Sequence, residues 1–149
     1  MKMSVQEFAD RINVIIPVMI REFARYQVNE LSKGRITLPQ FLILGFLEKS
    51  RETNMSSLAH FMSVSTAAMT GTVDRLVNCG YVIREPEPKD RRVIKIKITS
   101  KGRGIIKKIN CQRRQMIIDI FAKVSEHDRS DYLRVLTKIE EILSSEQVK

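Results

Sequence analysis

Hydrophobic positions along the chain recur with two periods, and these periods predict its secondary structure. Near the start, and again from Ser100 onward, apolar residues return every three to four positions, which is typical of amphipathic helices. We expect the first helix to bend at Pro17, which lacks a backbone donor, and to end at Lys33–Gly34. Its apolar stripe is formed by Val5, Phe8, Ile12, Ile15, Ile16, Met19 and Phe23.

Three shorter helices are predicted in the next part of the chain by residues that cap helix ends. The first of these helices begins at Thr37–Gln40. This segment combines a capping hydroxyl, a proline in the first turn and a glutamine whose side chain can bond back to the backbone at the capping residue. Ser56–Met62 is a second helix opened by a capping residue, and a short turn at Ser63–Ser65 follows it. Thr66–Asn78 is the third helix, which Gly80 closes.

The period then changes to two, which predicts a β-hairpin. In Val93–Thr99 three isoleucines alternate with two lysines, the pattern of a half-buried strand with one cationic face. Tyr81–Arg84 is the partner strand, and we expect Pro86 and Pro88 to confine the connection to a loop. After the long helix from Ser100, a capping box at Ser125–Asp128 opens a last helix.

These elements predict a single domain over residues 1–149 that is mainly α, with six α-helices and a small antiparallel sheet of two to three strands. The chain of 149 residues is 43% apolar, enough to bury a real core. It has no apolar run long enough to span a membrane and no signal-peptide pattern at its start, so we expect a cytoplasmic protein without a membrane partner.

The few cysteines and histidines argue against a metal site or a disulfide framework. Cys79 and Cys111 are far apart and lack a metal-binding spacing, so we expect both to be small buried hydrophobic side chains. His60 and His127 are isolated, and His127 lies within the predicted helix cap at Ser125–Asp128. We therefore predict no metal and no cofactor, and the sequence leaves open whether either cysteine has a redox role.

Positive charge is concentrated in one segment. Tyr81–Arg114 contains twelve Lys or Arg and three acidic residues, so its local net charge of +9 equals that of the whole chain. Charge confined in this way favours a polyanion as the partner, since scattered charge would mainly serve solubility. The segment begins with the predicted hairpin, directly after two short helices joined by a turn.

Two short helices joined by a tight turn suit recognition of the DNA major groove. At the start of the helix over Thr66–Asn78, compact side chains would let the helix approach base edges, and hydroxyl groups can bind phosphates or bases. The alternative is that the hydroxyls only cap the helix or face solvent. The candidate residues are Ser65, Thr66, Ala67 and Thr70.

The tip of the hairpin supports the DNA interpretation. Lys89, Asp90, Arg91 and Arg92 could place an arginine in the minor groove beside a helix held in the major groove. We expect the Asp90 carboxylate to orient the side chain of Arg92 or Arg75. A solvated turn is the alternative, but the local charge and the preceding helices favour function.

An ordered set of motifs resembles the winged-helix core of the MarR family. The resemblance extends to the layout of the flanking helices and so covers nearly the full length. It implies a winged helix-turn-helix lobe over residues 37–100 and a helical dimerisation lobe over residues 1–32 and 101–149. The motifs are Ser57–Leu58–Ala59, Thr72–Val73–Asp74–Arg75–Leu76, Gly80–Tyr81–Val82–Ile83–Arg84, Asp90–Arg91–Arg92 and Ile98–Thr99–Ser100–Lys101–Gly102.

The resemblance also implies a homodimeric transcription regulator, usually a repressor, that binds a pseudo-palindromic site in double-stranded DNA. The helix from Ser65 to Asn78 would be the recognition helix, Arg92 the wing arginine, and Arg75 and Asp90 a pair that shapes the wing. A small aromatic or anionic effector would release the DNA by binding between the lobes. Periodicity alone would line that pocket with Phe8, Ile12, Ile16 and Phe41.

Two other functions are less compatible with the sequence. A basic RNA-associated protein would need exposed aromatic platforms for single-stranded RNA, and this chain has no Trp and three Tyr. An enzyme would need a catalytic motif, and neither a Gly-rich phosphate loop, a nucleophile elbow nor a pair of catalytic carboxylates is present. The effector, the operator sequence, the regulated genes and the choice between repression and activation are not encoded in these patterns.

Overall fold

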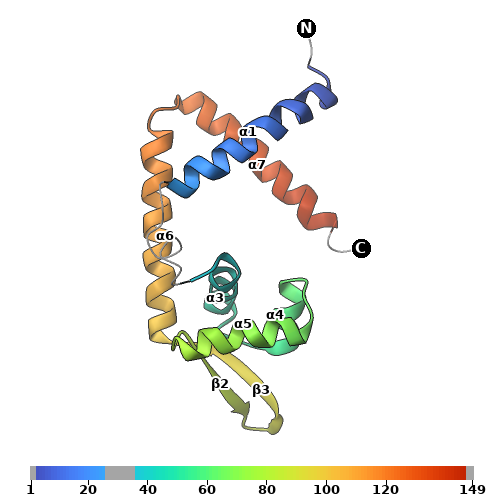
Figure 1. Cartoon of the computed structure of the whole chain (residues 1–149), viewed down its shortest axis with the longest axis vertical. Helices are drawn as coiled ribbons and strands as arrows, with labels where there is room; N and C mark the ends of the chain where they lie inside the picture. The colour runs from blue at the N-terminus through green and yellow to red at the C-terminus, as the bar shows by residue number, and fades with distance from the viewer. Residues whose placement is uncertain (1–2, 26–35, 147–149) are drawn as a thin grey trace. The chain divides into compact units, whose positions relative to one another are not determined.

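The computed structural model describes residues 3–25 and 36–146 (Figure 1). It divides into two compact units, with the boundary between Gln112 and Arg113 inside a long helix. The mainly α architecture with one small antiparallel sheet confirms the predicted fold class. The elements in chain order are α1 (Val5–Arg25), α3 (Leu38–Ser50), β1 (Glu52–Asn54), α4 (Met55–Phe61), α5 (Thr66–Asn78), β2 (Val82–Glu87), β3 (Asp90–Ile98), α6 (Ser100–Phe121) and α7 (Glu126–Glu146).

Side-chain caps start the helices of the first unit. At α3 the predicted capping box is confirmed, because the Gln40 amide donates to Thr37 Oγ1 and the Thr37 amide donates to Gln40 Oε1 at 2.8 Å. Helix α4 begins one residue before its predicted start, since Asn54 caps it by accepting from the Ser57 amide at 2.8 Å. The predicted end of the first helix, Lys33–Gly34, lies outside the described residues.

The sheet has the order β1-β3-β2, and both pairs of neighbouring strands are antiparallel. The hairpin is longer than predicted, and Pro86 lies within β2 opposite Ile94 rather than in the connecting loop. A proline is tolerated there because β2 is an edge strand, so the missing amide removes no bond from a central ladder. The connection shrinks to a turn at Pro88 and Lys89.

The core of the first unit lies between α3, α4, α5, α6 and the inner face of the sheet. Helix α5 contributes one buried stripe, and β3 contributes alternate residues as its period-two pattern predicts. Ile94 breaks the series, because this part of the hairpin extends beyond the core and leaves the side chain exposed. The buried apolar residues are Ile36, Phe41, Ile43, Leu44, Leu47, Leu58, Ala59, Met69, Val73, Leu76, Val82, Ile96, Ile98, Ile106 and Ile109.

Two glycines fix the base of the hairpin against the helices on either side. Gly80 has φ +72°, a left-handed conformation that ends α5 and turns the chain into β2. Gly102, in the first turn of α6, lies so close to the Tyr81 carbonyl that a Cβ atom would stand 2.2 Å from its oxygen. The Thr99 hydroxyl links the same parts, because it donates to the Gly80 carbonyl at 2.7 Å and accepts from the Gly102 amide at 3.0 Å.

The second unit consists of the last turns of α6 and helix α7. The rings of Phe121 and Tyr132 pack with centroids 5.4 Å apart, and Arg129 donates to the Phe121 carbonyl at 3.0 Å. Ser125 caps α7 by accepting from the Asp128 amide at 3.1 Å. No helix in the described ranges is long and apolar enough to cross a bilayer.

Candidate nucleic-acid interface

The start of α5 presents compact polar side chains to solvent. Ser65 caps the helix by accepting from the Ala68 amide at 3.2 Å, and Thr66 and Ala67 are exposed beside it. The Thr70 hydroxyl donates to the Thr66 carbonyl at 2.8 Å, which leaves its oxygen lone pairs facing outward. Because the opposite side of α5 is buried in the core, these four residues form the free face of a firmly held helix.

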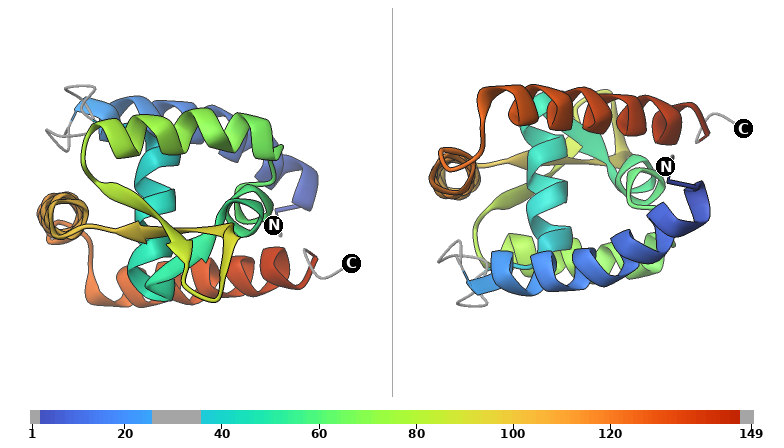
Figure 2. Two further views of the ribbon diagram at one scale, coloured as in Figure 1. Left: turned by 90° about the horizontal axis from the view of Figure 1, so that it is seen from below. Right: turned by 90° about the horizontal axis from the view of Figure 1, so that it is seen from above.

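The β2–β3 hairpin projects from the same side of the unit as α5. Seen from below, both lie in front of α3 (Figure 2, left), and β2 packs directly against α5. The tip of the hairpin carries Lys89, Arg91 and Arg92, all with exposed side chains. Across the described part of the chain, none of these three cations forms an ion pair. The positive charge of the tip is therefore available to an external anion.

Asp90 has a different role from the predicted one. Its carboxylate accepts a hydrogen bond from the Arg92 backbone amide at 3.0 Å, so it fixes the turn instead of holding an arginine side chain. Arg75 donates to the Gly71 carbonyl at 3.3 Å within its own helix. The predicted pairing of Asp90 with Arg75 or with the Arg92 guanidinium was wrong for the residues described, because Arg75 bonds within its own helix and the Asp90 carboxylate bonds the Arg92 backbone amide.

An ion pair that the sequence did not predict connects α5 to the hairpin. The Arg84 guanidinium in β2 lies 2.6 Å from the Asp74 carboxylate in α5. Together with the Thr99 and Gly102 contacts at the base, this bond holds the hairpin at a defined position beside α5. Both residues belong to motifs of the resemblance, but sequence spacing alone gives no sign that they meet.

The lysines on β3 are neutralised rather than free. Lys95 bonds the carboxylates of Glu52 and Glu87, and Lys97 lies 2.6 Å from Glu85 and 3.5 Å from Glu52. The hydrogen bond to Glu52 is the main cause that raises the pKa of Lys95 to about 12, and the bond to Lys95 lowers the pKa of Glu52. The cationic strand face expected from the sequence is thus an ion-pair cluster, and the net positive charge of the hairpin lies at its tip.

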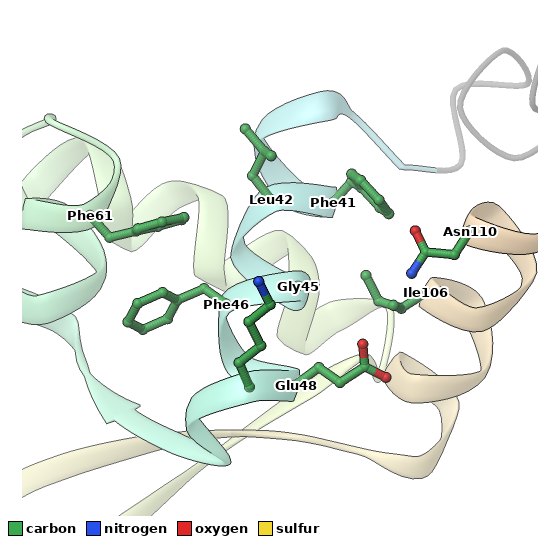
Figure 3. A pocket seen from close by; sticks show the side chains of 9 residues that line it. Phe41, Leu42, Gly45, Phe46, Glu48, Phe61, Ile106 and Asn110 are labelled. Atoms are coloured by element: carbon green, nitrogen blue, oxygen red, sulfur yellow. The ribbon is translucent and has the colours of Figure 1, made fainter. Parts of the chain in front are cut away.

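A separate cavity of about 450 Å³ lies between α3, α4 and α6 (Figure 3). Figure 3 shows Phe46 and Phe61 on one side and Ile106 and Asn110 of α6 on the other. Of the residues predicted for an effector pocket, Phe41 lines this cavity, whereas Phe8, Ile12 and Ile16 of α1 do not. The remaining lining residues are Leu42, Gly45, Glu48 and Lys49.

Both cysteines are exposed free thiols, so the expectation that they are buried was wrong. Cys79 follows the last residue of α5 and lies beyond its buried stripe. Cys111 comes two positions after buried Ile109, about 200° further around α6. Periodicity indicates the exposure of Cys111, whereas Cys79 comes three positions after buried Leu76, so its exposure does not follow from spacing.

The helix pair, the flanking hairpin and the exposed cations define a winged helix-turn-helix DNA-binding protein. Residues 36–94 match the model of the MarR family, and the chain is 34% identical over 103 residues to the multiple antibiotic resistance protein MarR of Escherichia coli, covering 65% of this chain and 72% of that protein. The chain belongs to the MarR family. It is therefore a transcription regulator and not an enzyme.

Other relatives extend the similarity over more of the chain. An uncharacterized HTH-type transcriptional regulator of Bacillus subtilis, YsmB, is 26% identical over 125 residues, which cover 84% of each chain. The crystal structure of Rv1404 from Mycobacterium tuberculosis matches with a TM-score of 0.79 and 27% identity, covering 95% of both chains. The family resemblance and the winged-helix fold predicted from the sequence are thus confirmed.

Proposed function

We propose that the protein is a homodimeric repressor that binds a pseudo-palindromic operator. Each α5 enters a major groove with Ser65, Thr66, Ala67 and Thr70 toward the bases, and each hairpin tip places Arg92 in the flanking minor groove. The observation that carries this proposal is the group of tip cations without ion pairs beside the exposed start of α5. A helix of this polarity also directs its partly positive end toward phosphate.

Exposed apolar side chains support the homodimer. Helices α1 and α7 each carry a row of large apolar residues on their surface, more than a monomer in water normally leaves uncovered. A second copy of the chain would bury both rows and set the distance between the two recognition helices. On α1 the residues are Val5, Phe8, Val14, Ile15, Ile16, Val18 and Ile20, and on α7 they are Tyr132, Leu133, Val135, Leu136, Ile139, Ile142 and Leu143.

The cavity supports the response to an effector. Three phenylalanines, Phe41, Phe46 and Phe61, contribute to its wall, and Lys49 adds a cation. Aromatic walls suit a small aromatic ligand, because its ring packs on apolar carbon; an anionic group on the ligand would meet the Lys49 ammonium group, and the Glu48 carboxylate lines the same cavity. Since α3 and α4 precede the recognition helix, a ligand between them and α6 would move α5 relative to the DNA.

Selection of bound duplexes from a random pool tests the operator prediction. We expect two inverted half-sites whose centres are about 10 bp apart, or a multiple of that, because successive major grooves face the same side of B-DNA at this spacing. A selected motif without two-fold symmetry, or no selected motif at all, would contradict the proposal.

Arg92→Ala tests the wing. We expect affinity for the selected operator to fall by about 10-fold or more, since each base-reading arginine contributes roughly 1–3 kcal/mol. Arg134→Ala on α7 removes the same charge in the other unit and should bind like the wild type. Sedimentation of all three proteins checks that the oligomeric state is unchanged. Equal operator binding by Arg92→Ala and the wild type would reject the assigned role of the wing.

A further inference from the structure

Three glutamates and two lysines form a continuous ion-pair cluster on the outer face of the sheet, which we name the acid–lysine ladder. All three strands contribute to it, with Glu52 on β1, Glu85 and Glu87 on β2, and Lys95 and Lys97 on β3. Lys95 Nζ lies 2.5 Å from Glu52 Oε1, and Lys97 Nζ lies 2.6 Å from Glu85 Oε2. Glu52 also reaches Lys97 at 3.5 Å, and Glu87 bonds Lys95, so each lysine contacts two carboxylates.

Strand register explains why the ladder is continuous. Glu52 is directly opposite Lys97, and Glu85 is directly opposite Lys95, but the shortest bond of each glutamate runs diagonally to the other lysine. Diagonal neighbours on one face of a sheet lie within reach of long side chains. The ladder therefore ties three strands together through side chains, on the face opposite buried Ile96.

We propose that the acid–lysine ladder limits sequence-independent DNA binding, because the glutamates keep Lys95 and Lys97 from binding DNA phosphates, so that the wing contacts DNA through its tip alone. This inference rests on the proposed function of the wing in DNA binding. Glu52, Glu85 and Glu87 do not touch DNA in this view. They are positioning residues that act through the lysines and hold the hairpin to β1.

The charge balance of the wing supports this role. The ladder contains three carboxylates and two ammonium groups, so it adds no positive charge to the hairpin. A phosphate that approached Lys97 would also approach the carboxylates of Glu52 and Glu85, which already occupy the ammonium group. Phosphate contacts carry no sequence information and strengthen binding to any duplex. Neutralising the two lysines thus lowers the affinity for operator and random duplex alike, and it keeps sequence-independent binding weak.

Comparing Lys97→Met with Lys89→Met tests the proposal, because both variants remove one lysine from the same hairpin. Binding to the operator and to a random duplex would be measured across a salt series. Each phosphate contact contributes ~0.9 to the slope of log K against log salt, so loss of Lys89 from both wings of a dimer should reduce the slope by ~2. We expect Lys97→Met to leave it unchanged. An equal decrease for the two variants would overturn the proposal.

The double variant Glu52→Gln/Glu85→Gln tests whether the glutamates withhold the lysines from DNA. It keeps the side-chain shapes and removes two negative charges. We expect affinity for random duplex to rise at least about 5-fold, with a slope steeper by ~2 to 4 as the lysines engage phosphates. Affinity for the operator should rise by a similar factor, because phosphate contacts do not depend on sequence. Unchanged affinity for random DNA, with a native circular-dichroism spectrum, would overturn the proposal.

Lysine ammonium NMR signals separate this inference from the function it rests on. When operator is added to wild-type protein, we expect the Lys89 signal to shift and the Lys95 and Lys97 signals to stay. Shifts at all three lysines would reject the proposed role of the ladder but support the wing as a DNA contact. No shift at Lys89 and no salt dependence for the wild type would reject DNA binding by the wing itself.

Discussion

Replacing Gly102 by Ala should loosen the joint between the wing and the long helix. A methyl group at this position would lie 2.2 Å from the Tyr81 carbonyl oxygen and 2.7 Å from Ile98 Cγ1, well inside ordinary contact distance. The carbonyl is backbone and cannot rotate away as a side chain would. The start of α6 must therefore move away from Tyr81 by a distance on the order of 1 Å.

Gly104, one half-turn further along α6, provides the matched control because a Cβ atom there would meet nothing within 4 Å. Glycine to alanine inside a helix gains up to about 1 kcal/mol from backbone preference, and this gain applies to both positions. The difference between the two variants is then the cost of overpacking at Gly102, typically about 1–3 kcal/mol. Gly104→Ala should be more stable than the wild type, and Gly102→Ala less stable than Gly104→Ala by that amount.

Urea unfolding of the wild type and both variants at one protein concentration measures this difference, since the stability of an oligomer depends on concentration. Operator binding gives a second readout, because movement of α6 at Tyr81 displaces the base of the hairpin relative to α5. We expect weaker binding by Gly102→Ala and unchanged binding by Gly104→Ala. If the two variants had equal stability and equal operator affinity, the close approach at Gly102 would not constrain the wing.

Two further predictions concern the core and the ion pairs. Leu44 is fully buried, so Leu44→Ala should lower the free energy of unfolding by about 2–5 kcal/mol in urea titrations, and a loss below 1 kcal/mol would show a site that collapses easily. The hydrogen bond from Lys95 lowers the pKa of Glu52, so its stabilisation is present above the unfolded value of about 4.3 and lost as pH falls through the folded value. The pKa of Lys95 is raised to about 12 in the folded protein. Its stabilisation is therefore complete below the unfolded pKa of about 10.4 and is lost as the pH rises through the folded pKa. The difference in unfolding free energy between wild type and Glu52→Gln should therefore be constant from about pH 6 to 10 and shrink outside this window.

Local sequence signals predicted most of the winged helix. The Thr37 capping box, the bounds of the helix over Thr66–Asn78 and the turn at Gly80 were correct because each depends on residues a few positions apart. Strand β1 was not located, since Glu52–Asn54 contains no apolar alternation and becomes a strand only by pairing with β3. The predicted hairpin was also too short. A proline such as Pro86 ends a central strand but is tolerated in an edge strand, and the sequence does not show which of the two it occupies.

The candidate interface was predicted less completely than the fold. Residue types and local charge identified the cations at the hairpin tip. Whether the other charged side chains of the hairpin are free depends on ion pairs with neighbouring elements, which the sequence does not show. The bond of Arg84 to Asp74 and those of Lys95 and Lys97 to three glutamates join different elements of the fold, and their geometry is set by packing and strand register. An excess of lysine on a strand gives the sign of the charge but not its partners. For this reason the sequence overestimates the free positive charge on the face of β3, whereas it predicts the free charge at the hairpin tip correctly.

The placement of Pro86 in an edge strand has a consequence for the protein at high concentration. An exposed hairpin edge is a template on which another extended chain can add by backbone hydrogen bonding, and such addition leads to polymers. The edge strand β2 carries Pro86, a bulge directly after it and alternating charged residues, all of which oppose that addition. The wing can therefore protrude far enough to reach a duplex without becoming an adhesive edge for other molecules of the same protein.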